Sequence, residues 1–143
     1  MTPRYSEPLF VISVAARLVE MHPQTLRKYE REGLIAPSRT TGNLRLYSDR
    51  DIERLRQVKY LVEERGLNLA GVQLALDLTA RLREFRSRLG ESGADGKADP
   101  AGAKRAGQLR RELDTTLAML GYIDQAELRL LREEARVQGQ GQD

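Results

Sequence analysis

The chain has 143 residues, with 24 Lys and Arg against 21 Asp and Glu, and it is 40% hydrophobic and 5% aromatic. This length and composition suit one small domain with an appendage and exclude a large enzyme core. Cysteine is absent and His22 is the single histidine, which excludes disulfides, thiolate metal sites and histidine-based triads. We therefore expect no metal, no cofactor and no enzymatic activity.

The charge is unevenly distributed along the chain. Residues 1–90 carry 16 basic against 11 acidic side chains, whereas residues 91–143 carry 8 against 10. A basic N-terminal part favours a polyanionic partner such as nucleic acid, with a solvated mixed-charge surface as the alternative. No apolar run approaches the roughly 20 residues that span a bilayer, so we expect a cytoplasmic protein.

The first predicted elements are a short strand and two helices. The apolar run at residues 9–12 predicts the strand, and Ser13 is well placed to cap the first helix. His22 ends this helix because the residue before a proline avoids the helical region, and Pro23 opens a second helix that Gly33 closes. Two short helices joined by a tight turn fit the helix-turn-helix pattern, whose second helix enters the DNA major groove.

Polar side chains on this second helix are suited to nucleic acid. They can donate to base edges or phosphates, while Leu26 anchors the helix to a core. An ordinary amphipathic surface helix is the alternative for this segment. The four candidate contacts are Gln24, Thr25, Arg27 and Lys28.

A β-hairpin is predicted next. Residues 35–47 contain two short arms around a Thr-Gly-Asn turn, and Pro37 restricts the first arm to a sheet edge. A helix-turn-helix followed by a hairpin is a winged helix, in which Arg39 and Arg45 would contact phosphates or the minor groove. A solvent-exposed hairpin with incidental arginines is the alternative.

Two further helices are predicted after the hairpin. Ser48 and Asp51 resemble a capping box for a helix that begins near Asp49 and stops at Gly66, and Asn68 can cap the next. That fourth helix reaches a basic run which either continues it as a solvated face or contacts DNA directly. The run comprises Arg81, Arg83, Arg86 and Arg88.

The C-terminal third predicts a linker and a long helix. Residues 90–103 are rich in Gly, Ala, Ser and Asp, which is typical of a flexible linker, and residues 104–137 carry a leucine stripe that predicts a coiled coil for self-association. Gly121 weakens this helix, so a helical hairpin folding back on the fourth helix is the alternative. The expected dimerisation residues are Leu109, Leu113, Leu117, Leu120, Ile123, Leu128 and Leu131.

In this arrangement the chain resembles the DNA-binding domain of the MerR family over about residues 10–80. Segments 22–27 and 66–72 are most similar to the HspR-type heat-shock repressors of that family. The residues that carry the family resemblance are Ser13-Val14-Ala15-Ala16, Thr25-Leu26-Arg27-Lys28-Tyr29-Glu30-Arg31-Glu32-Gly33-Leu34-Ile35, Pro37, Arg39, Gly42, Arg45, Tyr47, Ser48, Asp51 and Ile52.

The resemblance implies a homodimer on an inverted-repeat DNA site, with the C-terminal helices paired antiparallel. Leu44 departs from the tyrosine that many members place before the wing arginine. Tyr29 and Tyr47 have packing as an alternative role, and His22 is expected to be a turn residue. The implied DNA contacts are Gln24, Thr25, Arg27, Lys28 and Tyr29 on the recognition helix, Arg39, Asn43, Arg45 and Tyr47 on the wing, and Ser13 and Lys59 toward phosphates.

The expected protein is mainly α-helical, with a winged helix-turn-helix domain and a C-terminal dimerisation helix. The resemblance implies a nucleoid-associated repressor of chaperone or protease genes, controlled by heat or by the chaperone DnaK. Alternatives are an architectural DNA-binding protein or a MerR-type regulator with another effector. The predicted segments are a tail at 1–8, the domain at 9–89, the linker at 90–103, the helix at 104–137 and a tail at 138–143.

Overall fold

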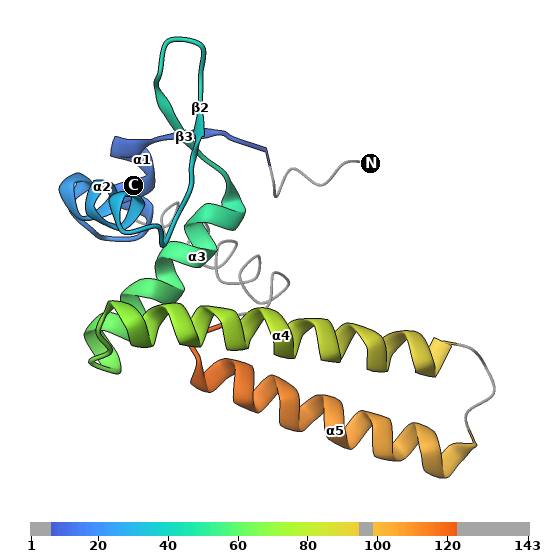
Figure 1. Cartoon of the computed structure of the whole chain (residues 1–143). Helices are drawn as coiled ribbons and strands as arrows, with labels where there is room; N and C mark the ends of the chain where they lie inside the picture. The colour runs from blue at the N-terminus through green and yellow to red at the C-terminus, as the bar shows by residue number, and fades with distance from the viewer. Residues whose placement is uncertain (1–6, 95–98, 123–143) are drawn as a thin grey trace, which may run out of the picture.

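The computed structural model of the chain describes residues 7–94 and 99–122, as a small sheet beside a set of helices (Figure 1). The sheet is antiparallel with strand order β1-β3-β2. The elements are β1 (Phe10–Val11), α1 (Ile12–Leu18), α2 (Pro23–Arg31), β2 (Ser38–Arg39), β3 (Arg45–Tyr47), α3 (Asp49–Lys59), the π-helical turn η2 (Tyr60–Glu64), α4 (Leu69–Ala94) and α5 (Pro100–Met119).

The predicted helix-turn-helix is confirmed as α1 and α2. Pro23 is the first residue of α2, and the side chain of His22 caps this helix by accepting a hydrogen bond from the backbone N–H of Gln24 at 3.1 Å. Gly33, with φ of +77°, follows the helix in the left-handed conformation that its sequence position predicts. The capping role predicted for Ser13 is wrong, because α1 already begins at Ile12 and its N-cap residue is Val11.

The predicted hairpin is confirmed, and it forms the wing. In the ladder, Ser38 pairs with Leu46 and Arg39 pairs with Arg45. The connecting turn is closed by a backbone hydrogen bond from Asn43 N–H to the Thr40 carbonyl (2.9 Å), and Asn43 adopts a φ of +66°. β1 completes the sheet by pairing Phe10 with Tyr47, so the wing is attached to the segment that leads into α1.

Local capping signals place α3 and α4 as predicted. Ser48 accepts a hydrogen bond from Asp51 N–H (3.1 Å) while the Asp51 carboxylate accepts one from Ser48 N–H (2.9 Å), which is a complete capping box. Gly66 is left-handed at the turn after η2. Asn68 then caps α4 by accepting a hydrogen bond from Gly71 N–H at 2.8 Å.

One hydrophobic core lies where α1, α2, the wing, α3 and the first turns of α4 meet. Its most deeply buried side chains come from all these elements, so each helix is held by side chains distant in sequence. The largest of them are Leu26, Leu34, Tyr47, Ile52, Leu55, Val58, Leu61 and Val72.

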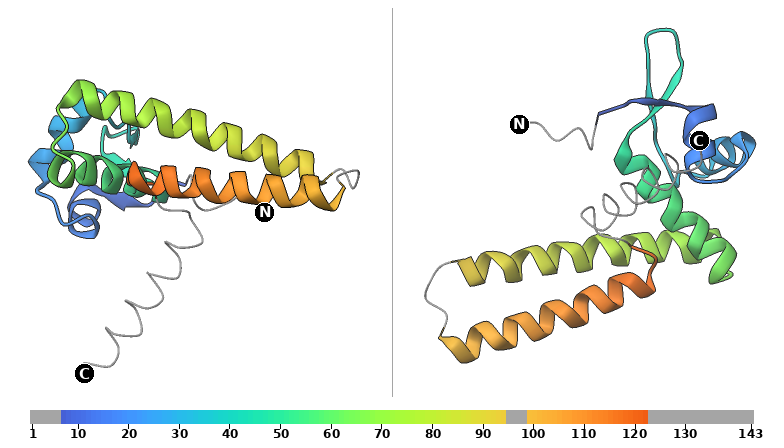
Figure 2. Two further views of the ribbon diagram at one scale, coloured as in Figure 1. Left: turned by 90° about the horizontal axis from the view of Figure 1, so that it is seen from below. Right: turned by 180° about the vertical axis from the view of Figure 1, so that it is seen from behind.

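The C-terminal part is a helical hairpin, the arrangement given above as the alternative. α5 runs antiparallel to α4, side by side in every view (Figures 1 and 2). Asp99 caps α5 through a hydrogen bond from Gly102 N–H at 2.7 Å, so the helix begins at Pro100. The predicted linker over 90–103 is therefore too long, because α4 extends to Ala94 and α5 starts before residue 104.

A single helix over 104–137 is also a wrong prediction. α5 ends at Met119, and Gly121 adopts a left-handed φ of +79°, which breaks the helical path. Two of the predicted dimerisation leucines, Leu113 and Leu117, are instead buried within the chain. Ile123, Leu128 and Leu131 lie outside the described residues. Within residues 7–94 and 99–122, no helix is both long and apolar enough to cross a bilayer.

Candidate nucleic-acid interface

The candidate recognition surface is the outer face of α2. Gln24 and Lys28 are exposed there, and Thr25 and Arg27 are partly exposed, while Leu26 points into the core. This division follows from helical periodicity, which puts residues 24 and 28 on one face, one turn apart. The structure therefore brings together on the surface four polar side chains of the kinds that contact bases and phosphates.

Glu30 connects this helix to the wing. Its carboxylate accepts a hydrogen bond from Arg39 Nη2 at 2.6 Å and another from Arg45 Nε at 2.5 Å, so one side chain of α2 holds an arginine from each wing strand. Burial alone would raise the pKa of Glu30, but the hydrogen bonds and charges of Arg45 and Arg39 outweigh it and lower that pKa. The recognition helix and the wing are thus joined electrostatically.

This connection changes the role expected for the two wing arginines. Arg39 also donates from Nη1 to the Asn43 carbonyl at 3.2 Å, which braces the turn at the wing tip. The side chains of both arginines remain part-exposed beside their ion pairs. Asn43 and Leu44 are exposed at the turn, and Leu44 is half exposed with no polar side-chain group to offer to DNA.

The two predicted tyrosine contacts are core residues. Tyr47 is fully buried and Tyr29 is 8% exposed, so the prediction of a DNA contact from the Tyr47 side chain is wrong and packing is its role. The Tyr47 hydroxyl is buried without a hydrogen-bond partner in the described part of the chain. Burial raises the pKa of both tyrosines, with further increases from Glu30 for Tyr47 and from Glu63 and Glu32 for Tyr29.

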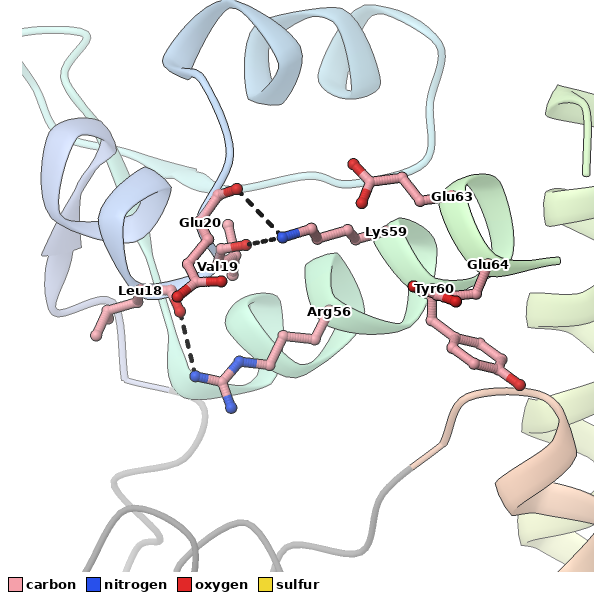
Figure 3. Close-up of a pocket in the computed structure, with 8 residues that line it drawn as sticks. All are labelled: Leu18, Val19, Glu20, Arg56, Lys59, Tyr60, Glu63 and Glu64. Carbon is pink, nitrogen blue, oxygen red and sulfur yellow. Dashed lines mark hydrogen bonds between the residues drawn. The ribbon is translucent and has the colours of Figure 1, made fainter. Parts of the chain in front are cut away.

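Lys59 is occupied within the fold. Its ammonium donates to the backbone carbonyls of Val19 and Glu20, each at 3.2 Å, at the C-terminal end of α1 (Figure 3). A cation at a helix C-terminus is stabilised by the helix dipole and by the last, otherwise unpaired carbonyls. Lys59 thus makes a structural contact within the fold, and its phosphate contact stays a prediction. Ser13 is exposed in the first turn of α1.

Three side chains that sequence reasoning missed position the interface. Glu30 is the first, and the sequence feature that could have indicated its role is a carboxylate within an otherwise basic helix. Arg56 donates to the Leu18 carbonyl at 3.3 Å, beside Lys59 (Figure 3), and Arg54 donates from Nε to the Leu34 carbonyl at 2.6 Å, just after α2. The two arginines lie in α3 and contact the chain at the C-terminal end of α1 and just after α2, and no local pattern in the sequence indicates these contacts.

The elements together define a winged helix-turn-helix, with an exposed polar recognition helix and a wing anchored to it. Residues 10–79 match the MerR HTH family regulatory protein family. The match covers 70 of the 143 residues and includes the helix-turn-helix, the wing and α3, in line with the resemblance.

Curated relatives extend the comparison. HspR of Streptomyces coelicolor, a heat shock protein by name, is 50% identical over 93 residues, which are 64% of this chain and 62% of that protein. The transcriptional regulator GlnR of Bacillus anthracis is 40% identical over 73 residues, 51% of this chain and 56% of GlnR. MlrA of Escherichia coli, another transcriptional regulator, is 38% identical over 69 residues, 48% of this chain and 28% of MlrA. The chain thus spans about six-tenths of the length of HspR and of GlnR.

Proposed function

We propose that the protein is a transcriptional repressor of heat-shock genes that binds an inverted-repeat site as a homodimer. The observation that carries this proposal is the 50% identity to HspR over 93 residues, which extend beyond the 70 residues of the family match. A regulator of chaperone or protease genes on the chromosome would be found with the nucleoid.

DNA recognition is assigned to α2 and the wing. Arg27 and Gln24 are suited to bidentate contacts with base edges, and Thr25 and Lys28 to bases and nearby phosphates. Ser13 and Asn43 supply phosphate contacts from α1 and the wing tip. Arg39 and Arg45 present their remaining N–H groups while Glu30 fixes their orientation. Tyr29 contributes by packing α2 onto the core.

Homodimerisation is assigned to the α4–α5 hairpin. In a single chain, this hairpin leaves Leu74 63%, Phe85 45% and Leu109 37% exposed, an apolar surface that a second copy would cover. The predicted dimerisation residues Leu120, Ile123, Leu128 and Leu131 stay part of this proposal. Sedimentation velocity tests this assignment: Leu109→Glu should shift the full chain from dimer toward monomer, and an unchanged dimer would contradict it.

Control by heat or by DnaK follows from the proposed kinship with HspR. The binding of labelled inverted-repeat DNA by the full chain, measured with and without added DnaK and between 30 and about 50 °C, separates the two routes. Tighter binding on adding DnaK supports a co-repressor role. A loss of binding on warming, without DnaK, supports direct sensing of heat.

Arg27→Ala tests the recognition helix itself. Removing a bidentate base contact should weaken binding to the specific site about tenfold or more and relax the preference for it over unrelated DNA. Arg31→Ala is the matched control, since Arg31 is an exposed residue at the end of the same helix. Equal losses in both variants would contradict the assignment.

Chromosomal occupancy mapped before and after heat shock then tests the target genes: broad binding would favour an architectural protein.

A further inference from the structure

A polar cavity lies on the side of the molecule where α3, α4 and α5 meet, outside the candidate DNA surface. It has a volume of about 750 Å³, within the range of small-molecule sites. Four arginines from the three helices line it, against two carboxylates, which leaves two positive charges in excess. The arginines are Arg50 of α3, Arg83 and Arg86 of α4 and Arg110 of α5, and the carboxylates are Glu84 and Asp114.

The carboxylates of this cavity already have cationic partners. Asp114 accepts a hydrogen bond from Arg86 at 2.8 Å, and Glu84 accepts one from Arg88 at 2.6 Å. In the described part of the chain, neither Arg50 nor Arg110 forms an ion pair. Their charges therefore remain available at the cavity wall.

Arg83 is held in place by an aromatic ring. Its guanidinium lies over the Tyr122 ring with 4.7 Å to the ring centroid, and Tyr122 is itself buried. A guanidinium that lies over a ring face can still donate its N–H groups in its own plane, which is the geometry that binds oxyanions. Tyr122 directly follows Gly121, so the segment just after α5 positions this arginine.

An adjoining smaller cavity adds one arginine and one carboxylate to the lining. It has a volume of about 100 Å³ and shares Arg50, Arg83 and Tyr122 with the larger one. Arg54 lines it as well, and burial, followed by the charge of Arg50, lowers the pKa of Arg54. Glu53 lines the smaller cavity as the added carboxylate, and Asp77 and Asp51 oppose the lowering of the Arg54 pKa, so the two cavities together keep the same excess of two positive charges.

We propose that this cavity, which we call the arginine cavity, binds a multiply charged phosphate ligand of the size of a tripolyphosphate or the phosphate chain of a nucleotide. Planar guanidinium groups bind phosphate oxygens bidentately, and the lining offers little apolar surface for a hydrophobic ligand. Because the arginines come from three helices, the ligand would brace α5 against α3 and α4. The proposal does not depend on the function assigned to α2.

Calorimetric titration of the full chain with sodium tripolyphosphate tests the proposal. We expect saturable binding of one ligand per chain, and a loss of at least tenfold in affinity in the double variant Arg83→Gln/Arg110→Gln. The matched control is Arg81→Gln/Arg105→Gln, which removes the same charge from exposed positions on the same two helices and should change affinity less than twofold. Equal losses in both variants, or no saturable binding to the unaltered chain, would overturn the proposal.

Two further arms keep the result interpretable. Arg50→Gln removes a cavity cation without touching the Tyr122 stack, so a matching loss of affinity in a fully folded variant supports the site. The second arm measures duplex DNA binding against salt concentration, because DNA phosphates share the ligand's chemistry. If the double variant weakens duplex binding while the unaltered chain binds no tripolyphosphate, the arginines serve the DNA backbone and the small-ligand site is overturned.

Discussion

The carboxylate of Glu30, on the recognition helix, lies 2.5 Å from the Nε atom of Arg45, on the inner strand of the wing. Arg39 shares the same carboxylate from the neighbouring strand. One acidic side chain therefore orients the recognition helix and the wing, the two elements of a winged helix that contact DNA. A carboxylate is not itself suited to a polyanionic partner. If the chain binds DNA as proposed, these two ion pairs fix the orientation of the wing in the free protein.

Neutralising Glu30 should loosen the wing. Part-exposed ion pairs contribute up to about 1 kcal/mol each, so Glu30→Gln should lower affinity for the specific site about fivefold, although it removes a negative charge near DNA. Glu32→Gln is the matched control, because Glu32 is the exposed C-cap residue of α2 and forms no ion pair among the described residues. Fluorescence anisotropy measures both. Tighter binding in both variants would show that simple charge repulsion dominates instead.

The same pair predicts a pH dependence of stability. The hydrogen bonds from Arg45 and Arg39 lower the pKa of Glu30 below its ordinary 4.5, against the opposing effect of burial. A carboxylate with a lowered folded-state pKa contributes stability above its unfolded-state pKa and loses it as the pH falls through the lower, folded value. At pH 7, urea unfolding should therefore give a larger free energy of unfolding for the unaltered chain than for Glu30→Gln. This difference should narrow below pH 4.5. A difference in free energy of unfolding that stays constant down to about pH 3 would contradict the link between the Glu30 pKa and stability.

Substitution of Lys59 should lower the stability of the fold, whereas substitution of Lys28 should change DNA binding. Lys59→Met removes two charge-assisted hydrogen bonds to the end of α1, so we expect a loss of about 1 to 2 kcal/mol in the free energy of unfolding and an unchanged salt dependence of DNA binding. Lys28→Gln on the exposed face of α2 should leave the free energy of unfolding unchanged. It should reduce the salt slope, which is the slope of log DNA affinity against log salt concentration, by about 0.9. Denaturant unfolding and salt titrations of DNA affinity check the pair. A reduced salt slope for Lys59→Met would restore it as a phosphate contact.

Gly121 should be intolerant of any side chain. Its φ is +79°, and a Cβ atom there would lie 2.5 Å from Cδ1 of Tyr60, so Gly121→Ala should destabilise the chain by about 2 kcal/mol or more. Gly107→Ala is the control, since Gly107 lies inside α5 where a Cβ meets only an arginine tip at 3.8 Å. That change should stabilise by roughly 0.5 to 1 kcal/mol through helix propensity. Thermal unfolding of both variants measures the difference, and equal melting temperatures would contradict the packing at Tyr60.

Sequence alone located the elements whose signals are local. Pro23 and Gly33 bound the recognition helix, Ser48 and Asp51 form the capping box that starts α3, and the Thr-Gly-Asn turn closes the wing. Each of these signals acts between residues a few positions apart, where backbone geometry and one hydrogen bond decide the conformation. For the same reason the resemblance to the MerR family could be seen from the order of the residues.

Only the tertiary structure decided what the side chains of those elements do. Arg39 and Arg45 pair with a carboxylate on another element, Lys59 caps a helix some forty positions away, and Tyr47 packs inside the core. The stripe of α5 is apolar whether it faces a second copy or α4, so its pattern could not choose between a long coiled coil and a hairpin. Gln57 of α3 donates to the Leu120 carbonyl at 3.0 Å and helps to hold the end of α5 in place. Contacts between distant residues depend on how the helices pack, and the spacing of residues within one segment does not determine that packing.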